Sequence, residues 1–154
     1  MIKKGIEDKK RWPEWDRETA KVEVAWDSDD DGVSITVSLD DAPVGKLRAK
    51  REDQVLIISE IRIEPQITVK QKVGFFFRRS AAKGTGRGYG TMLIKALVAY
   101  ARNRGFKMIV GGLTAEELKQ NRFALEWYSR RGFIVARQPC PLIPGSAASM
   151  QMLI

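Results

Sequence analysis

The segment Lys83-Gly84-Thr85-Gly86-Arg87-Gly88-Tyr89-Gly90-Thr91 has a glycine at every second position from residue 84 to residue 90. Glycine adopts backbone angles that a Cβ atom forbids, and it lets a ligand come close to the main chain. The run 92–104 that follows is rich in good helix formers, and Gly105 stands where a helix commonly ends. The glycines therefore lead into a helix N-terminus, which is a ready site for phosphate, and Lys83 and Arg87 add positive charge to it.

Two common phosphate-binding loops do not fit this segment. The fingerprint G-x-G-x-x-G would need a third glycine at Tyr89 or Thr91, and no Gly-Lys-Ser/Thr follows at the nucleotide-triphosphate spacing. A G-x-G pair opening an apolar helix instead resembles the pyrophosphate loop of the GNAT N-acetyltransferase superfamily, roughly Gln/Arg-x-x-Gly-x-Gly/Ala, here residues 85–90. Thr85 departs from that pattern. Taken alone, the segment also fits a flexible glycine-rich turn or an Arg-Gly segment that contacts RNA.

A second helix is predicted downstream of the glycine loop. Thr114 and Glu117 form a capping-box pattern, so we expect the helix to start there, run to about Arg130 and stop at Gly132. Between the two helices, residues 106–110 are short and apolar, which predicts a buried strand and therefore a βαβ unit.

This second helix carries a second match to the family. Asn121, Ala124, Tyr128 and Gly132-Phe133 resemble its Asn-x-x-Ala-x-x-x-Tyr…Gly-Phe pattern. Asn121 and Tyr128 are seven residues apart, so one continuous helix would place them on the same face. For a single aromatic residue here, a place in the core is the alternative. The resemblance covers roughly residues 33–154.

Alternating and apolar segments predict the strands of a sheet, at residues 21–26, 33–39, 44–49, 55–63, 133–136 and 149–154. The resemblance implies an α/β (α+β) GNAT fold, with a mixed, mostly antiparallel sheet of about six to seven strands flanked by helices. In that fold the strand at residues 55–63 splays from its neighbour at 106–110, and the pantetheine arm of the coenzyme lies in the opening.

Residues 66–83 separate the central strand from the glycine loop by more than the family usually allows. We interpret this segment as an inserted hairpin beside the substrate cleft. The alternative makes residues 73–77 the true central strand. The chain is otherwise read as one domain, 1–154, that opens with a polar N-terminal arm at residues 1–20.

Composition excludes several kinds of chemistry. The chain has 154 residues, no histidine and one cysteine, so neither a His-based triad nor an internal disulfide is available, and no metal site is expected. The acidic turn at residues 27–32 lacks the spacing of a calcium loop. No apolar run is long enough for a membrane span, and we expect a cytoplasmic protein. The net charge of +8 suits a polyanionic coenzyme, with nucleic acid as the less favoured partner.

The resemblance implies acetyl transfer from acetyl-CoA to a small-molecule or peptide amine by direct attack. It assigns the pyrophosphate to the main chain of Thr85, Gly86, Arg87, Gly88, Tyr89, Gly90 and Thr91. It assigns the pantetheine arm to the main chain of Ile61, Arg62 and Ile63 and to the side chain of Asn121. The fold often forms dimers, which leaves a homodimer open.

Tyr128 matches the tyrosine that donates a proton to the coenzyme sulfur, and a pKa near 10 suits that role. Glu60 is the candidate base, because burial beside an apolar strand would raise its pKa towards neutrality. An exposed Glu60 paired with Arg62 is the equally weighted alternative, and Glu64 is the second candidate base. Cys140 has no partner base in the sequence, which disfavours it as a nucleophile. A catalytically silent member of the fold and a small RNA- or ribosome-associated protein are the competing functions.

Overall fold

The structure is a computed structural model that describes residues 2–4, 21–73 and 76–154. Of the expected N-terminal arm, residues 5–20 lie outside the described part. In chain order, the described elements are β1 (Ile2–Lys4), β2 (Val22–Ser28), β3 (Gly32–Leu39), β4 (Ala42–Glu52), β5 (Val55–Ile63), β6 (Gln66–Val73), β7 (Phe76–Lys83), α2 (Tyr89–Arg104), β8 (Met108–Leu113), α3 (Ala115–Gln120), α4 (Ala124–Ser129), β9 (Ile134–Ala136) and β10 (Ala148–Leu153).

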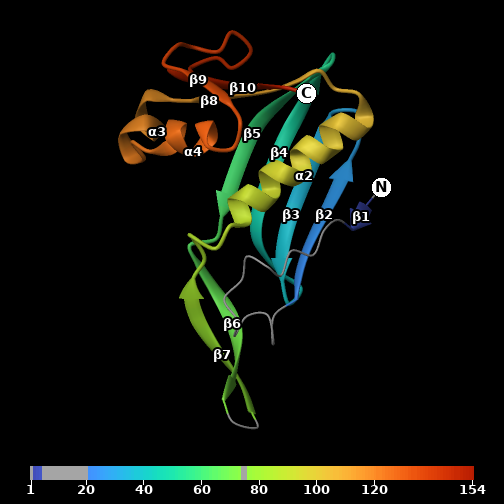
Figure 1. The fold of residues 1–154 in the computed structure, drawn as a ribbon, viewed down its shortest axis with the longest axis vertical. Helices are drawn as coiled ribbons and strands as arrows, with labels where there is room; N and C mark the ends of the chain where they lie inside the picture. Colours follow the sequence, from blue (N-terminus) through green and yellow to red (C-terminus); the bar gives the residue numbers. More distant parts are fainter. Residues whose placement is uncertain (1, 5–20, 74–75) are drawn as a thin grey trace.

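One large sheet organises the molecule, in the order β1-β2-β3-β4-β5-β8-β10-β9 (Figure 1). Every neighbouring pair is antiparallel except β5 and β8, which run parallel. The predicted mixed, mostly antiparallel sheet is therefore confirmed. It has eight strands in the described residues, one more than the upper expectation, because the short β1 pairs with β2 at one edge.

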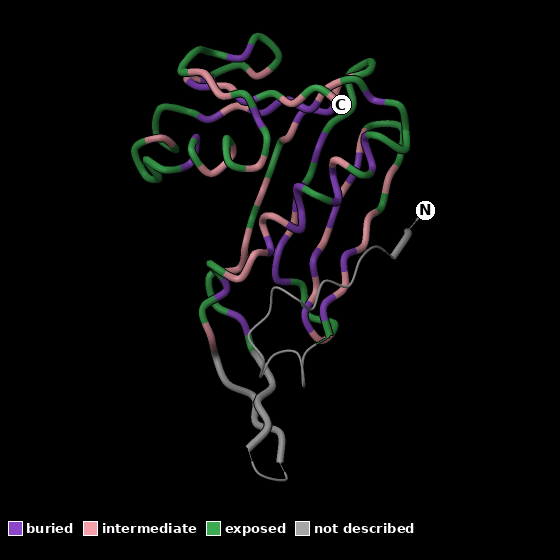
Figure 2. Tube along the Cα trace, viewed as in Figure 1, coloured by how far each residue is buried: buried purple, intermediate pink, exposed green. Residues whose placement is uncertain are grey.

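The core lies between this sheet and α2, which crosses the face formed by β2, β3 and β4 (Figures 1 and 2). Leu93 and Leu97 of α2 are fully buried against Ile35 of β3 and Leu47 of β4. Burying one such side chain stabilises the fold by about 1.5–3 kcal/mol. The core therefore holds α2, and with it the glycine loop, in a fixed place over the sheet.

The central strands diverge as the resemblance implies. Strand β5 pairs with β8 only through Val55–Ile57, opposite Met108–Val110. Directly after this pairing, the register of β5 with β4 shifts by one residue, so that Ser59 is an extra residue between Ile58 and Glu60. Such a bulge bends the strand and increases its twist. The bulge thus accounts for β5 leaving β8, and in the described residues no strand pairs with that edge of β5 beyond Ile57.

Residues 66–73 and 76–83 pair as an antiparallel hairpin, and these strands, β6 and β7, make a separate two-stranded sheet. The hairpin extends from the end of β5 away from the rest of the molecule (Figure 1). Since β5 is the strand that pairs with β8, the alternative that placed the central strand at residues 73–77 is wrong.

The single helix expected from Thr114 to Arg130 is two short helices, α3 and α4. The capping box at its start is confirmed, because Thr114 Oγ1 accepts from the Glu117 N–H and Glu117 Oε1 accepts from the Thr114 N–H, both at 3.1 Å. The break comes at Asn121, whose Oδ1 accepts from the Phe123 N–H at 3.2 Å. This local side-chain bond competes with the helical pattern and ends α3 there.

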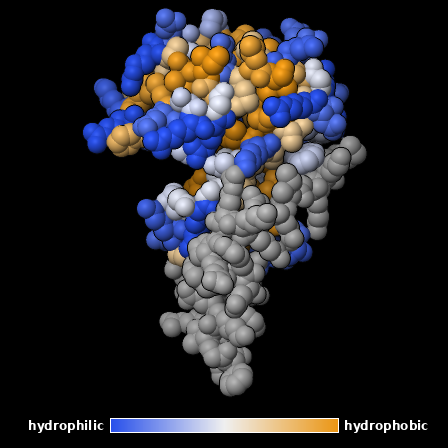
Figure 3. All heavy atoms as spheres, in the orientation of Figure 1, coloured by the Kyte–Doolittle hydropathy of each residue, from blue (hydrophilic) through white to orange (hydrophobic). Residues whose placement is uncertain are grey.

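Apolar surface gathers in the upper part of the molecule, where α2 and the C-terminal strands lie (Figure 3). The most exposed large apolar side chains of the described residues are Phe123, Ile134, Leu142 and Leu153. Among the described helices, none is long and apolar enough to cross a membrane. Cys140 is buried, and its N–H donates to Ser146 Oγ at 2.7 Å.

Candidate functional site

A cleft of about 710 Å³ lies where β5 and β8 diverge. Its lining comes from the free part of β5, the glycine loop, the first turn of α2, the end of β8, and α3 with α4. The lining residues are Ile61, Ile63, Gly84, Thr85, Gly86, Gly88, Tyr89, Gly90, Thr91, Leu113, Glu117, Gln120, Asn121, Ala124, Trp127, Tyr128 and Arg131. The fold thus brings the two matched motifs into one cleft, although they are about thirty residues apart in sequence.

Two of the loop glycines are needed for packing. A Cβ atom on Gly84 would lie 1.8 Å from the backbone oxygen of Glu64, and the Gly84 N–H donates to Pro65 O at 3.0 Å. A Cβ atom on Gly90 would lie 2.7 Å from Cζ2 of Trp127. Gly84 therefore lets the loop pass close to the end of β5, and Gly90 lets α4 pack on α2.

The other two loop glycines face open space. Gly86 has a φ of +79° and Gly88 a φ of +84°, in the left-handed region that favours glycine, and a Cβ on either would meet no atom within 4 Å. Gly88 is the N-cap of α2, and no side chain caps the helix there. Gly86, Gly88 and the first N–H groups of α2 therefore surround an open space at the positive end of the helix. We call this space the open cradle, and it fits a phosphate group.

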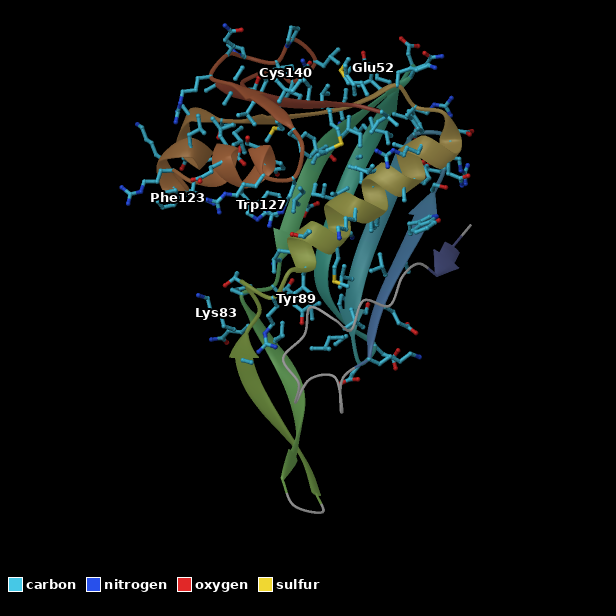
Figure 4. All side chains as sticks on the ribbon, in the orientation of Figure 1. Glu52, Lys83, Tyr89, Phe123, Trp127 and Cys140 are labelled. Carbon is cyan, nitrogen blue, oxygen red and sulfur yellow. The ribbon has the colours of Figure 1, made fainter. Side chains whose placement is uncertain are left out.

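The remaining loop residues divide between cleft and core. Thr85 and Thr91 line the cleft, whereas the Tyr89 side chain is 1% exposed and belongs to the core, so only its main chain can serve a ligand. Lys83 lies at the foot of the hairpin beside the loop (Figure 4). Arg87 is outside the cleft lining, because its Nε donates to Lys83 O at 2.7 Å and so turns the side chain back along the loop.

Arg131 completes the cleft wall, and sequence reasoning missed it. Its Nε donates to Thr91 Oγ1 at 2.9 Å, its Nη1 donates to Trp127 O at 2.8 Å, and its Cζ lies 3.7 Å from the centre of the Trp127 ring. The residue thus ties α4 to the first turn of α2 and places a cation beside the glycine loop. Its position after Tyr128 was the only sequence signal, since the bond to Thr91 spans forty residues.

Tyr128 stands on the same wall, with its ring perpendicular to those of Trp127 and Phe133 at 4.9 and 5.5 Å between centres. Burial and, less strongly, the nearby Glu117 carboxylate together raise the pKa of Tyr128 to about 12. The expected pKa near 10 is therefore too low. At neutral pH the hydroxyl is protonated and can donate a hydrogen bond into the cleft.

Asn121 lines the cleft together with Tyr128. The prediction that one continuous helix places both residues on the same face is wrong. Asn121 is the C-cap of α3, with φ −136° and ψ 88°, and Tyr128 lies in α4. The turn between the helices brings both to the cleft, and Trp127 points from α4 towards the start of α2 (Figure 4).

Glu60 does not line this cleft. The bulge at Ser59 puts Ile61 and Ile63 on the cleft side of β5 and leaves Glu60, Arg62 and Glu64 on the opposite face. Glu60 is exposed there, so the burial on which its role as base was argued is wrong. Arg62 instead lies 3.7 Å from Glu64, an ion pair that the alternative had given to Glu60.

The face that carries Glu60 has a hollow of its own, of about 350 Å³. Charged residues line it, Lys46 and Arg48 from β4, Glu60 and Arg62 from β5, and Glu64 directly after β5. The cleft and this hollow therefore lie on opposite sides of the same free stretch of β5. Among the described residues, no group of three or more potential ligands could hold a metal ion.

Comparison with known proteins supports the same fold. The chain resembles the PaiA N-acetyltransferase of Thermoplasma acidophilum in complex with coenzyme A, at 14% identity and a TM-score of 0.58, over 80% of this chain and 62% of that one. It also resembles a GNAT family acetyltransferase of Elizabethkingia anophelis with acetyl-CoA bound, at 17% identity and a TM-score of 0.53, over 80% and 77% of the two chains. Tetrahymena GCN5 is similar at 12% identity and a TM-score of 0.55, over 82% and 70%.

This chain thus spans less than two thirds of the Thermoplasma protein, and identities this low show the fold alone. A search of curated proteins gives no match. The sequence profile of the acetyltransferase (GNAT) family matches residues 5–133, and so begins well before residue 33, where the resemblance was first evident. Because this profile covers most of the chain, the protein belongs to the GNAT acetyltransferase family.

Proposed function

We propose that the protein transfers an acetyl group from acetyl-CoA to an amine, by direct attack within the cleft between β5 and β8. The observation that carries this proposal is the open cradle at Gly86 and Gly88, at the uncapped N-terminus of α2 and beside the free edge of β5. Coenzyme A bound in one similar fold and acetyl-CoA in another support this choice of ligand.

Binding is assigned to main-chain groups on two sides of the cleft. The N–H groups of residues 86–91 bind the pyrophosphate, whose negative charge is stabilised at the positive end of α2. The backbone of Ile61, Arg62 and Ile63 forms hydrogen bonds with the pantetheine amides, as an added strand does at a free sheet edge. Asn121, on the opposite wall, binds the same arm through its amide.

The reaction requires one proton to leave the amine and one to reach the sulfur. The amine nitrogen attacks the thioester carbonyl carbon, the C–S bond breaks, and the acetyl group ends on nitrogen. Tyr128 donates its hydroxyl proton towards the leaving sulfur. With its pKa raised to about 12, the hydroxyl is protonated at neutral pH when each turnover begins, stabilises the developing thiolate by its hydrogen bond, and regains from water the proton that it passes to the sulfur.

Glu60 remains the proposed base, now from the other face of β5. The charged hollow there is open to an amine that approaches from the side opposite the coenzyme cleft. Lys46 and Arg48 in this hollow suit an amine that also carries an anionic group. Direct transfer then takes place in the opening between β5 and β8, where the amine, entering past the free edge of β5 from the other face, meets the thioester.

The experiment is a calorimetric titration with acetyl-CoA and with CoA, followed by a thiol-release assay against a panel of amines. Micromolar binding and amine-dependent thiol release are expected. Tyr128→Phe should lower kcat with little change in the KM for acetyl-CoA, and Glu60→Gln should lower kcat for every amine of the panel. Absence of binding would contradict the proposal. Binding without release on any amine would favour a catalytically silent module.

A further inference from the structure

The β6–β7 hairpin is not needed to build the cleft. Its strands pair over eight consecutive register positions, from Gln66 opposite Lys83 to Val73 opposite Phe76, without a bulge. They form their own sheet, and only the base of the hairpin is joined to the end of β5 and the start of the glycine loop. The rest extends away from the molecule as a regular two-stranded ribbon (Figure 1).

Charge is concentrated on this ribbon. Residues 66–83 contain no Asp or Glu and carry five basic residues, Lys70, Lys72, Arg78, Arg79 and Lys83. Five of the eight net positive charges of the chain therefore belong to this segment. The register sets Lys70 directly opposite Arg79, so both strands carry basic residues at the same level of the ribbon. This concentration of positive charge suits a polyanion.

The dimensions favour a macromolecule over a small anion. Strands of eight residues span about 27 Å at the usual rise of about 3.4 Å per residue, so the ribbon reaches far beyond the cleft mouth. The major groove of B-form DNA is about 12 Å wide and admits a two-stranded β-ribbon, whereas the major groove of an RNA duplex is deep and narrow. A ribbon with cations on both strands can reach phosphates of both DNA strands.

We propose that the β6–β7 hairpin binds double-stranded DNA, mainly through phosphate contacts. The proposal does not depend on acetyl transfer, because the four cations that the test removes, Lys70, Lys72, Arg78 and Arg79, are not assigned to the coenzyme cleft. It gives the hairpin a role that the predicted insertion beside the cleft lacked, and it makes nucleic acid a partner of this segment rather than of the glycine loop.

The test is fluorescence anisotropy with a mixed-sequence 20-base-pair DNA duplex over a range of salt concentrations. The ribbon variant is Lys70→Gln/Lys72→Gln/Arg78→Gln/Arg79→Gln. The matched control, Lys50→Gln/Lys107→Gln/Lys119→Gln/Arg137→Gln, removes the same charge from exposed positions elsewhere. Thermal unfolding and acetyl-CoA titration of each variant report whether the main fold is kept. The two paired variants, Lys70→Gln/Lys72→Gln and Arg78→Gln/Arg79→Gln, serve if the fourfold variant does not fold.

Each phosphate contact adds about 0.9 to the slope of log affinity against log salt. We therefore expect the ribbon variant to bind at least tenfold more weakly and to lower this slope by about 3–4, with about half that change in each paired variant. The control should stay within about twofold of the wild type. Absence of DNA binding, equal weakening in ribbon variant and control, or tighter binding to an RNA duplex or to polyglutamate would overturn the proposal.

Discussion

The cleft has a packed wall and an open cradle, and the glycine loop contributes to both. Gly84 and Gly90 lie against atoms that leave no room for a side chain, namely Glu64 O and the Trp127 ring. Gly86 and Gly88 lie between them in sequence and meet nothing within 4 Å. The same residue type at regular spacing thus serves packing at its ends and ligand access at its centre. A glycine-rich motif is therefore a mixture of structural and binding positions.

The largest effect should come from adding a methyl group on the packed side. Gly84→Ala places Cβ against the backbone oxygen of Glu64, which cannot turn away as a side chain can. We expect the free energy of unfolding to fall by about 3 kcal/mol, as in severe overpacking. Gly86→Ala is the matched control and should cost only about 1–2 kcal/mol, from its left-handed backbone. An equal loss of unfolding free energy in the two variants, measured by urea unfolding, would contradict the distinction between packed and open glycines.

A second effect concerns Tyr128 in the packed wall and depends on pH. The pKa of Tyr128 is raised in the folded state. Its contribution to the free energy of unfolding is therefore complete below pH 10 and is lost as the pH rises through about 12. The wild type should lose about 2–3 kcal/mol relative to Tyr128→Phe across that window. Urea unfolding of both proteins between pH 9 and pH 12 measures the difference. If the unfolding free energies of the two proteins changed with pH in parallel, the raised pKa of the Tyr128 hydroxyl would be contradicted.

Glu117→Gln sharpens this test. Glutamine can replace glutamate in the capping box, so the start of α3 should be kept while the charge near Tyr128 is removed. The pKa of Tyr128 should fall but stay above 10, because burial is its larger cause. An absorbance titration of tyrosinate reads this directly.

A smaller effect tests how α4 is fixed to α2. Arg131→Gln removes the bond to Thr91 and the stacking on Trp127, and should lower the free energy of unfolding by about 1–2 kcal/mol. Arg130→Gln is the control. It breaks only an exposed pair with Glu126 one helical turn away and should cost about 0.3–0.5 kcal/mol. A loss of stability in Arg130→Gln but not in Arg131→Gln would contradict the role of Arg131 in fixing α4 to α2.

The sequence predicted best those features that depend on interactions between residues close together in the chain. The Gly105 stop of α2, the capping box at Thr114 and the alternation of β3 depend on neighbours in the chain, and the structure has all three. The family motifs also pointed to the two sides of one cleft. The start of α2 was placed three residues late, since Tyr89–Thr91 had been assigned to the loop.

The remaining features depend on contacts that no local pattern records. The bulge at Ser59 decides that Ile61 rather than Glu60 faces the cleft, and an extra residue in one strand leaves no mark in its alternation until the partner strand is known. The bond between Arg131 and Thr91 joins two distant segments. Asn121 breaks the predicted helix through its own side chain, which competes with favourable helix formers around it. A homodimer, which the resemblance left open, stays open.

The central claim is that the coenzyme binds at the open cradle. Gly88 and Gly105 cap the two ends of α2, both have positive φ, and a Cβ on either would meet nothing within 4 Å. Gly88→Ala and Gly105→Ala therefore carry similar backbone strain, but only Gly88 lines the cleft. The decisive measurement is the calorimetric dissociation constant of CoA for these two variants. The account predicts at least tenfold weaker binding for Gly88→Ala and wild-type binding for Gly105→Ala, whereas equal affinities would contradict it.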